Sequence, residues 1–259
     1  MTRRHAAAAA VAMAALALPP VAMAQSAAAP PPAAHEKAPH DWTGFYRLAT
    51  SARDLAGLQP LNPNLPETIF AHLKPWAKAK MEATDGIAED TGQLCQPTGI
   101  FRNPPFAGSF LWLPGAEKIV VVYGATNTAG IERVYLNRKH PRNLLPTWNG
   151  DSIGHWEGDT LVIDTKGFND KSWLQPTMEP HTEEAHMIRR IRQVKDGYIE
   201  IHYTVEDWKA LTSAYAYSRY YRRVGESLAE NVCNEDPEIW RGFKNERFKP
   251  ILERSREVR

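Results

Sequence analysis

The 259-residue sequence has only two cysteines, Cys95 and Cys233, and no Cys-x-x-C spacing of the kind that holds zinc. It has no Gly-rich phosphate loop, neither G-x-x-x-x-G-K-[ST] nor G-x-G-x-x-G. Its 31 basic and 30 acidic residues leave a formal net charge of +1, so no field of one sign recruits a polyanion. These absences argue against a nucleotide-binding fold and a nucleic-acid partner.

Long apolar runs are also scarce, and the one that exists lies at the N-terminus. Arg3 and Arg4 precede an apolar run over residues 6–18, and Ala22-Met23-Ala24 supplies a small-x-small cleavage pattern. We therefore expect residues 1–24 to be a signal peptide. The chain is then exported, to a periplasm or beyond, and keeps no membrane span after cleavage.

An uncleaved N-terminal anchor is the alternative, which Pro19 and Pro20 disfavour because they end the apolar run early. The leader holds two basic residues and no acidic one, so the remaining chain carries a formal charge of −1. Residues 25–40 are rich in Ala and Pro, which is typical of a flexible or extended linker. Residues 41–259 are long enough for one domain with a hydrophobic core.

The two cysteines most simply form a disulfide, because an exported chain folds in an oxidising compartment. Such a Cys95–Cys233 bridge would join the early part of the domain to its C-terminal segment. Two free thiols or thiols that bind metal remain the alternative.

Short β-rich runs with turn signals between them dominate the domain. Asp- or Gly-containing turns lie at residues 114–115, 157–159 and 195–197, each between two runs rich in β-branched and aromatic residues. Residues 66–84 predict a helical segment that Pro75 divides, and residues 85–108 read as a loop. We expect a mostly β domain, an antiparallel meander forming a barrel or a sandwich, with a C-terminal segment from Cys233 wrapping the outside.

The last predicted strand has an aromatic and basic face that includes Tyr217 and Arg219. If this face points inward, it lines a pocket for a flat or anionic ligand through stacking and cation–π contacts. The outward orientation is favoured, because a buried arginine needs a partner that the sequence does not identify.

The segment Pro180-His181-Thr182-Glu183-Glu184-Ala185-His186 concentrates groups that can carry protons. Histidine titrates near neutral pH and a desolvated glutamate approaches it, so His181, Glu183 and His186 are the candidate catalytic residues. A solvated loop and a metal site made of the same three side chains are the alternatives. The spacing matches no known zinc motif, and we expect no metal or other cofactor.

Six further residues are candidates for the ligand site. Three of them are expected to shape the site and three to contact the ligand: Asp164, Asn169 and Asp170, then Trp156, Tyr217 and Arg219.

The string SIGHWEGDTLVIDTKGFND from Ser152, followed by Trp173 and PHTEEAH, resembles an uncharacterised family of exported bacterial proteins. The resemblance extends to the Asp41-Trp42-Thr43-Gly44 start and to both cysteines, but His155 stands where that family has Arg or Lys. It supports the domain boundaries and the loop without implying a reaction. More loosely, the Gly44-Phe45-Tyr46 opening and the meandering strands are similar to lipocalin-like barrels, which include ligand carriers and enzymes.

We therefore predict a periplasmic barrel that binds a small aromatic or anionic molecule and acts on it by acid–base chemistry, as a lyase, isomerase or hydrolase. A ligand-binding protein without turnover and an envelope protein-interaction module are the alternatives. The sequence leaves the substrate and the oligomeric state open.

Overall fold

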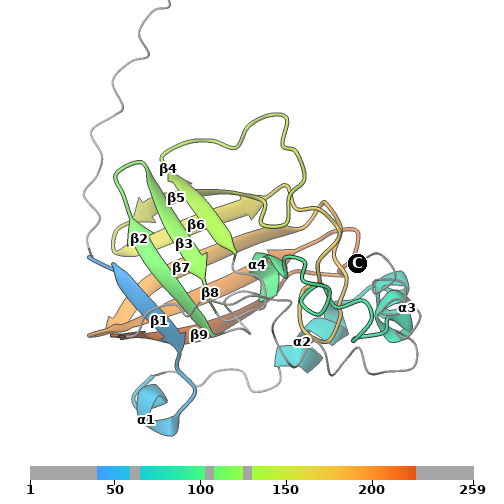
Figure 1. Cartoon of the computed structure of the whole chain (residues 1–259), viewed down its shortest axis with the longest axis horizontal. Coiled ribbons are helices and arrows are strands. Elements are labelled where there is room, and N and C mark those ends of the chain that lie inside the picture. Colours follow the sequence, from blue (N-terminus) through green and yellow to red (C-terminus); the bar gives the residue numbers. More distant parts are fainter. Residues whose placement is uncertain (1–39, 59–64, 103–107, 125–129, 226–259) are drawn as a thin grey trace, which may run out of the picture. The chain divides into compact units, whose positions relative to one another are not determined.

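The computed structural model describes residues 40–58, 65–102, 108–124 and 130–225. In the helix that begins at Leu65, side chains are described from Ile69 onward. The chain divides into two compact units, Met1–Ala34 and His35–Arg259, and every described residue belongs to the second. In that unit the nine described strands form a closed barrel (Figure 1). The predicted mostly β fold is confirmed, as a barrel and not a sandwich.

Along the chain, the strands are β1 Gly44–Leu48, β2 Ser109–Pro114, β3 Lys118–Tyr123, β4 Ile131–Leu136, β5 Asp151–Glu157, β6 Thr160–Lys166, β7 His186–Lys195, β8 Tyr198–Glu206 and β9 Tyr215–Val224. The helices are α1 Ala52–Leu55, α2 Leu65–His72, α3 Pro75–Ala83 and α4 Gly99–Arg102. None of the helices in the described part of the chain is long and apolar enough to cross a membrane.

Three hairpins lie where turn residues predict them. The β2–β3 turn follows Pro114, the β5–β6 turn contains Gly158, and the β7–β8 turn contains Gly197. Gly158 and Gly197 have φ of +63° and +70°, a conformation that glycine adopts without a steric penalty.

Strands β4 and β5 form a parallel pair, unlike the other neighbouring strands of the described barrel, which are antiparallel. The pair is short: its register runs only from Val134↔Ser152 to Leu136↔Gly154. Parallel neighbours need a long crossover, and residues 137–150 supply it without a helix. The segment 137–150 is called the crossover loop below.

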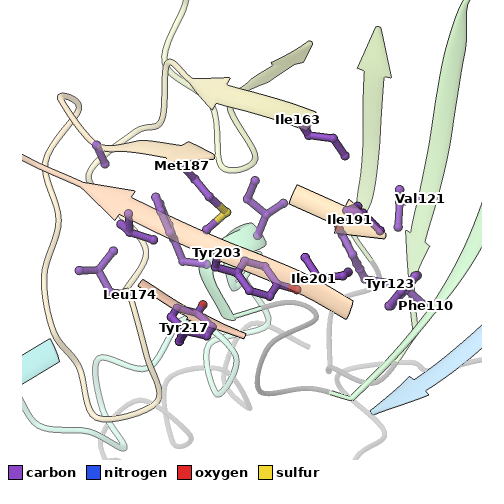
Figure 2. Packing of buried hydrophobic residues seen from close by; sticks show 14 of the residues in the cluster. Phe110, Val121, Tyr123, Ile163, Leu174, Met187, Ile191, Ile201, Tyr203 and Tyr217 are labelled. Carbon is purple, nitrogen blue, oxygen red and sulfur yellow. The ribbon is translucent and has the colours of Figure 1, made fainter. Parts of the chain in front are cut away.

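Side chains alternate between the barrel interior and the outer wall, as the period of two requires. On β8 the apolar face, which includes Ile201 and Tyr203, is buried (Figure 2). The rings of Tyr203 and Tyr217 stack with centroids 4.8 Å apart, and the Tyr203 and Tyr221 hydroxyls lie within 3.1 Å. The interior is therefore a packed aromatic core with a few polar atoms.

The favoured outward orientation of the last strand is wrong. Tyr215, Tyr217 and Tyr221 of β9 are buried in the barrel core. Arg219 is half-buried, with its guanidinium 5.3 Å from the centroid of the Tyr217 ring. Burial of three aromatic rings outweighs the cost of one half-buried arginine.

Pro75 divides the predicted helical segment into α2 and α3, and it occupies the first turn of α3, where its missing N–H costs nothing. The prediction of a loop over residues 85–108 missed α4. That helix begins at Gly99 with φ of +73° and buries Ile100 and Phe101. A four-residue helix carries too little periodicity to be recognised in sequence.

The predicted leader, residues 25–39 of the Ala/Pro-rich linker and the C-terminal wrapping segment lie outside the described residues. So does Cys233, and the Cys95–Cys233 disulfide therefore stays a prediction.

Candidate functional site

The loop between β6 and β7, residues 167–185, packs beside α4 at one end of the barrel (Figure 1). Its apolar side chains are buried in the body of the protein: Phe168, Trp173, Leu174, Met178 and Ala185. Buried side chains fix a loop in place, so this predicted site loop is largely a packed end layer of the core.

His181 lies inside that layer. Its Nε2 is 2.8 Å from the Ser172 hydroxyl, its Nδ1 is 3.1 Å from the Thr182 carbonyl oxygen, and its ring lies 4.8 Å from the Phe101 ring. A carbonyl only accepts, so Nδ1 carries the proton and Nε2 accepts from Ser172. Burial lowers the pKa of His181, which keeps the ring neutral.

The Ser172–His181 pair has the composition of a nucleophile and its base, but both side chains are only 2% exposed. Asp207, also buried, accepts from the Thr182 backbone N–H at 2.6 Å and from the Thr182 hydroxyl at 2.9 Å. These hydrogen bonds join residues within the loop and attach the loop to Asp207, which follows β8. We interpret them as structural.

The other predicted residues of this loop do not converge on His181. Glu183 and Asp170 are exposed. Asn169 is buried and accepts from the Lys171 backbone N–H at 3.2 Å through its side-chain oxygen. Among the described residues, no hydrogen bond or ion pair joins any two of His181, Glu183 and His186.

The structure instead joins His186 to Asp164 and to a residue that the sequence did not single out. Asp164 Oδ1 lies 2.8 Å from His186 Nε2 and 3.2 Å from His140 Nε2. Asp164 and His186 point outward from neighbouring strands β6 and β7, and His140 reaches them from the crossover loop. These three residues are called the His–Asp–His cluster.

Asp164 is ionised in this cluster. Its partial burial alone would raise its pKa, but hydrogen bonds from His186 and His140 and the charge of His186 lower the pKa to about 2. An ionised carboxylate only accepts hydrogen bonds, so both histidines present Nε2–H to it. In a neutral ring, Nδ1 then carries the lone pair.

The Nδ1 atom of His140 is buried and has no hydrogen-bond partner within the described structure. It lies 3.7 Å from Oδ2 of Asp151, the first residue of β5. Asp151 also forms an ion pair with Arg138. On the far side of the cluster, His186 Nδ1 lies 3.6 Å from a Glu206 carboxylate oxygen. A row of neighbouring titratable side chains therefore crosses the outer wall of the barrel, with Asp151 at one end, the His–Asp–His cluster in the middle and Glu206 at the other end.

Asp151 borders a cavity of about 650 Å³ between the crossover loop and the outer face of β4. We call this cavity the β4 cleft. Its lining includes Arg133, Tyr135, Arg138, Leu144, Trp148 and Asp151. Small-molecule sites commonly enclose about 300–1,000 Å³ with apolar walls and a few polar groups, so the β4 cleft has a suitable size and chemistry.

The short β4–β5 pairing creates this cleft. Ile131 and the next two residues have no partner on β5, and the Asn149 amide donates to the Ile131 carbonyl at 3.2 Å instead. The Thr147 backbone donates to Gly167 at 3.0 Å and accepts from Asn169 at 2.8 Å, so the crossover loop is bound to the β6–β7 loop. Asn169 therefore shapes the site through its backbone.

The predicted ligand contacts lie elsewhere. Trp156 is opposite Leu161 near the β5–β6 turn, with its ring centroid 5.2 Å from that of Trp42. Asp151 is at the other end of β5, so Trp156 and the His–Asp–His cluster occupy opposite ends of the strand. Tyr217 and Arg219 belong to the barrel interior described above.

The interior also contains a charged network that sequence inspection missed. Arg189 and Glu132 form an ion pair and are 3% and 2% exposed. Glu132 also accepts from the Ser152 hydroxyl at 2.6 Å and from the Tyr123 hydroxyl. Burial opposes ionisation of both groups, but their mutual attraction lowers the pKa of Glu132 and raises the pKa of Arg189. The pair is therefore charged, and its carboxylate is fully bonded.

The string Gly150-Asp151-Ser152-Ile153-Gly154 has the G-x-S-x-G spacing of a nucleophile elbow. In the structure it is the start of strand β5, and no helix follows it. Ser152 points into the core, where it bonds to Glu132 and to the Thr165 hydroxyl at 2.9 Å. It is not placed as a nucleophile.

Within the described ranges, no three His, Cys, Asp or Glu side chains are arranged to hold a metal ion together. This includes the predicted alternative at His181, Glu183 and His186.

The chain matches no family model and no curated protein sequence. Solved structures with some likeness include a REP1-NXSQ fatty acid transporter, at 12% identity over 71% of this chain and 97% of the other, with a TM-score of 0.36. They also include a mutant of the fluorescent protein UnaG, at 13% identity over 71% of this chain and 97% of the other, with a TM-score of 0.35. At these values no property is carried over from either protein, and the family resemblance of the WEGDTLVID string stays a prediction.

Proposed function

We propose that the β4 cleft binds a small organic molecule and that the His–Asp–His cluster exchanges protons with it. The reaction class is the predicted one, acid–base chemistry of a lyase, isomerase or hydrolase. Because we expect the chain to be exported, we propose that this activity takes place in the periplasm. The observation that carries the proposal is the buried, unbonded Nδ1 of His140, which lies 3.7 Å from a carboxylate of the cleft wall.

The geometry supports a short proton path. A proton that leaves the ligand would pass to the Asp151 carboxylate and then to His140 Nδ1, which has its lone pair free. Protonated His140 would stand between two carboxylates, those of Asp151 and Asp164. The reverse transfer would return the proton to the product.

The roles of the predicted residues change in this proposal. His186 keeps a place in the acid–base group, where it orients the ionised Asp164. His181 holds the β6–β7 loop, and Glu183 has no part.

A ligand-binding protein without turnover is the second candidate. It is favoured by the fact that both histidines bond to the same oxygen of Asp164, which is also how a purely structural brace between two strands and a loop would be built.

The test begins with a thermal-shift screen of the mature chain against a metabolite library, since a ligand of the native state raises the melting temperature. For a hit, His140→Gln is compared with His155→Gln, which alters an exposed histidine paired with Glu157 at the other end of β5. Turnover of the hit should fall by roughly 100-fold or more in His140→Gln and stay unchanged in His155→Gln.

The outcomes separate the candidates. Binding that survives His140→Gln with loss of turnover supports the enzyme. A hit that the wild-type chain binds without converting it supports the non-catalytic alternative. A hit whose melting-temperature shift is unaffected by Trp148→Ala and Leu145→Ser binds outside the β4 cleft and overturns both.

A further inference from the structure

The outer face of β2, β3 and β4 is apolar although it lies on the outside of the barrel. Leu111, Val122 and Ile131 stand side by side across the three strands, and Leu113, Val120 and Arg133 form the next row. Ile131 is 51% exposed and Leu113 is 41% exposed. An apolar outer wall of this kind commonly marks a place where another molecule lies.

This apolar wall continues into the β4 cleft. Ile131 lines the cleft from the β4 side, and Leu144, Leu145 and Trp148 line it from the crossover loop. Leu145 is 83% exposed. Apolar surface therefore faces the cleft from both sides, which suits a ligand with a sizeable apolar body.

Arg133 is the cation within these two apolar rows. Arg133 lines the cleft between these surfaces, and no carboxylate of the described residues lies within ion-pair distance of it. The other arginine of the lining, Arg138, is occupied: it pairs with Asp151 and its guanidinium lies 3.7 Å from the Tyr135 ring centroid. Arg133 is thus the guanidinium of the cleft that is left to receive an anion.

We infer that the β4 cleft takes an amphiphilic organic anion, with its acid group on Arg133 and its apolar body between Ile131, Leu144 and Trp148. The guanidinium offers two parallel N–H donors, a geometry that fits carboxylate, sulfonate and phosphate groups alike. Arg133 is exposed, so its guanidinium is accessible to a ligand that enters the cleft. This inference rests on the proposed function, because it assumes that the cleft is the ligand site.

Two fluorescent probes with the same ring system provide the test. Anilinonaphthalene sulfonate carries a negative charge, and phenylnaphthylamine is the same molecule without the sulfonate. Both are titrated into the mature chain and into Arg133→Gln. We expect the affinity for the sulfonate to fall by roughly tenfold in Arg133→Gln, and the affinity for the neutral probe to stay unchanged.

Arg142→Gln is the matched control. Arg142 is an exposed arginine of the same crossover loop, and its side chain is outside the cleft lining, so its removal changes the net charge equally. An equal loss of sulfonate affinity in Arg133→Gln and Arg142→Gln would show a general charge effect and overturn the inference. Unchanged near-ultraviolet circular dichroism verifies that each variant keeps its tertiary packing.

Two further variants separate this inference from the proposed function. Trp148→Ala and Leu145→Ser remove apolar lining, and Leu145 is too exposed for its loss to unfold the protein. If they weaken both probes while Arg133→Gln weakens neither, the cleft is a binding site and the anion anchor is wrong. If no variant changes either probe, or if the wild type binds neither, both the cleft assignment and the inference fail.

Discussion

Two groups of charged residues in this protein each join a carboxylate to basic side chains, but they differ in burial and in hydrogen bonding. The Glu132–Arg189 pair lies inside the barrel, where the carboxylate receives hydrogen bonds from Arg189, Tyr123 and Ser152. The His–Asp–His cluster lies on the outer wall, partly exposed, and leaves the Nδ1 of His140 unbonded.

The difference lies in what each group can still do. A buried carboxylate whose bonds are complete has no capacity left for a ligand, and its removal mainly exposes the cost of burying a charge. A cluster beside a cleft with one open nitrogen can exchange a proton without breaking an existing bond. A buried carboxylate with complete hydrogen bonding therefore indicates a structural role, and an imidazole nitrogen without a hydrogen-bond partner beside a cavity indicates a chemical one.

The largest expected effect is on the interior pair. Arg189→Met leaves the Glu132 charge buried without a counter-ion and should lower the free energy of unfolding by about 3–5 kcal/mol, measured by urea denaturation. The double variant with Glu132→Gln should recover part of this loss, because no charge is then left in the core. Arg190→Met, which breaks an exposed pair with Glu157, should change little. A small effect of Arg189→Met would contradict the structural role of the pair.

An intermediate effect on the free energy of unfolding is expected for the buried hydrogen bond between Ser172 and His181. Ser172→Ala leaves the His181 Nε2 without a donor and should cost about 1–3 kcal/mol in the free energy of unfolding. The matched control is Ser213→Ala, which removes an exposed hydroxyl 2.7 Å from His72 Nδ1. Similar costs for the two substitutions would mean that burial of the Ser172–His181 pair does not matter, and the structural interpretation of His181 would then fail.

The smallest expected effect is the contribution of Asp164 to the loss of stability at acidic pH. Its pKa of about 2 lies below the ordinary value of 3.8, so its stabilising contribution is complete above about pH 4 and is lost as the pH falls through about 2. The stability difference between wild type and Asp164→Asn should shrink over this window, as followed by thermal unfolding. Asp170→Asn, an exposed control, should run parallel to wild type. A constant difference for Asp164→Asn would show that its bonds to the histidines do not favour the ionised form.

Some residues of the site could be predicted from the sequence. Asp164 and His186 were both candidates, because an acid at a strand end and a histidine at the next strand start fall beside a loop. Glu132 and Arg189 could have been found as well. Glu132 is the single charged residue on the core-facing side of β4, and Arg189 lies between the apolar Met187 and Ile191 on the core-facing side of β7.

His140 could not have been found in this way. It lies in a loop without periodicity, 24 residues from Asp164 in the chain, and only the fold of the crossover loop brings the two together. The β4 cleft has the same origin, because it exists where the parallel β4–β5 pairing is too short to close the wall. The separation of Trp156 from the cluster follows from hairpin register, which places the two at opposite ends of β5.

By itself, the sequence determined the strands, their hairpin turns and the division of the helical segment at Pro75. These features depend on side-chain alternation and on the backbone limits of Gly and Pro, which act within a few residues. The tertiary structure alone decided that the tyrosines of β9 face inward, that His181 is buried, and that His140 meets Asp164. Those outcomes depend on barrel closure and on the competition for burial among distant segments, and no local pattern records them.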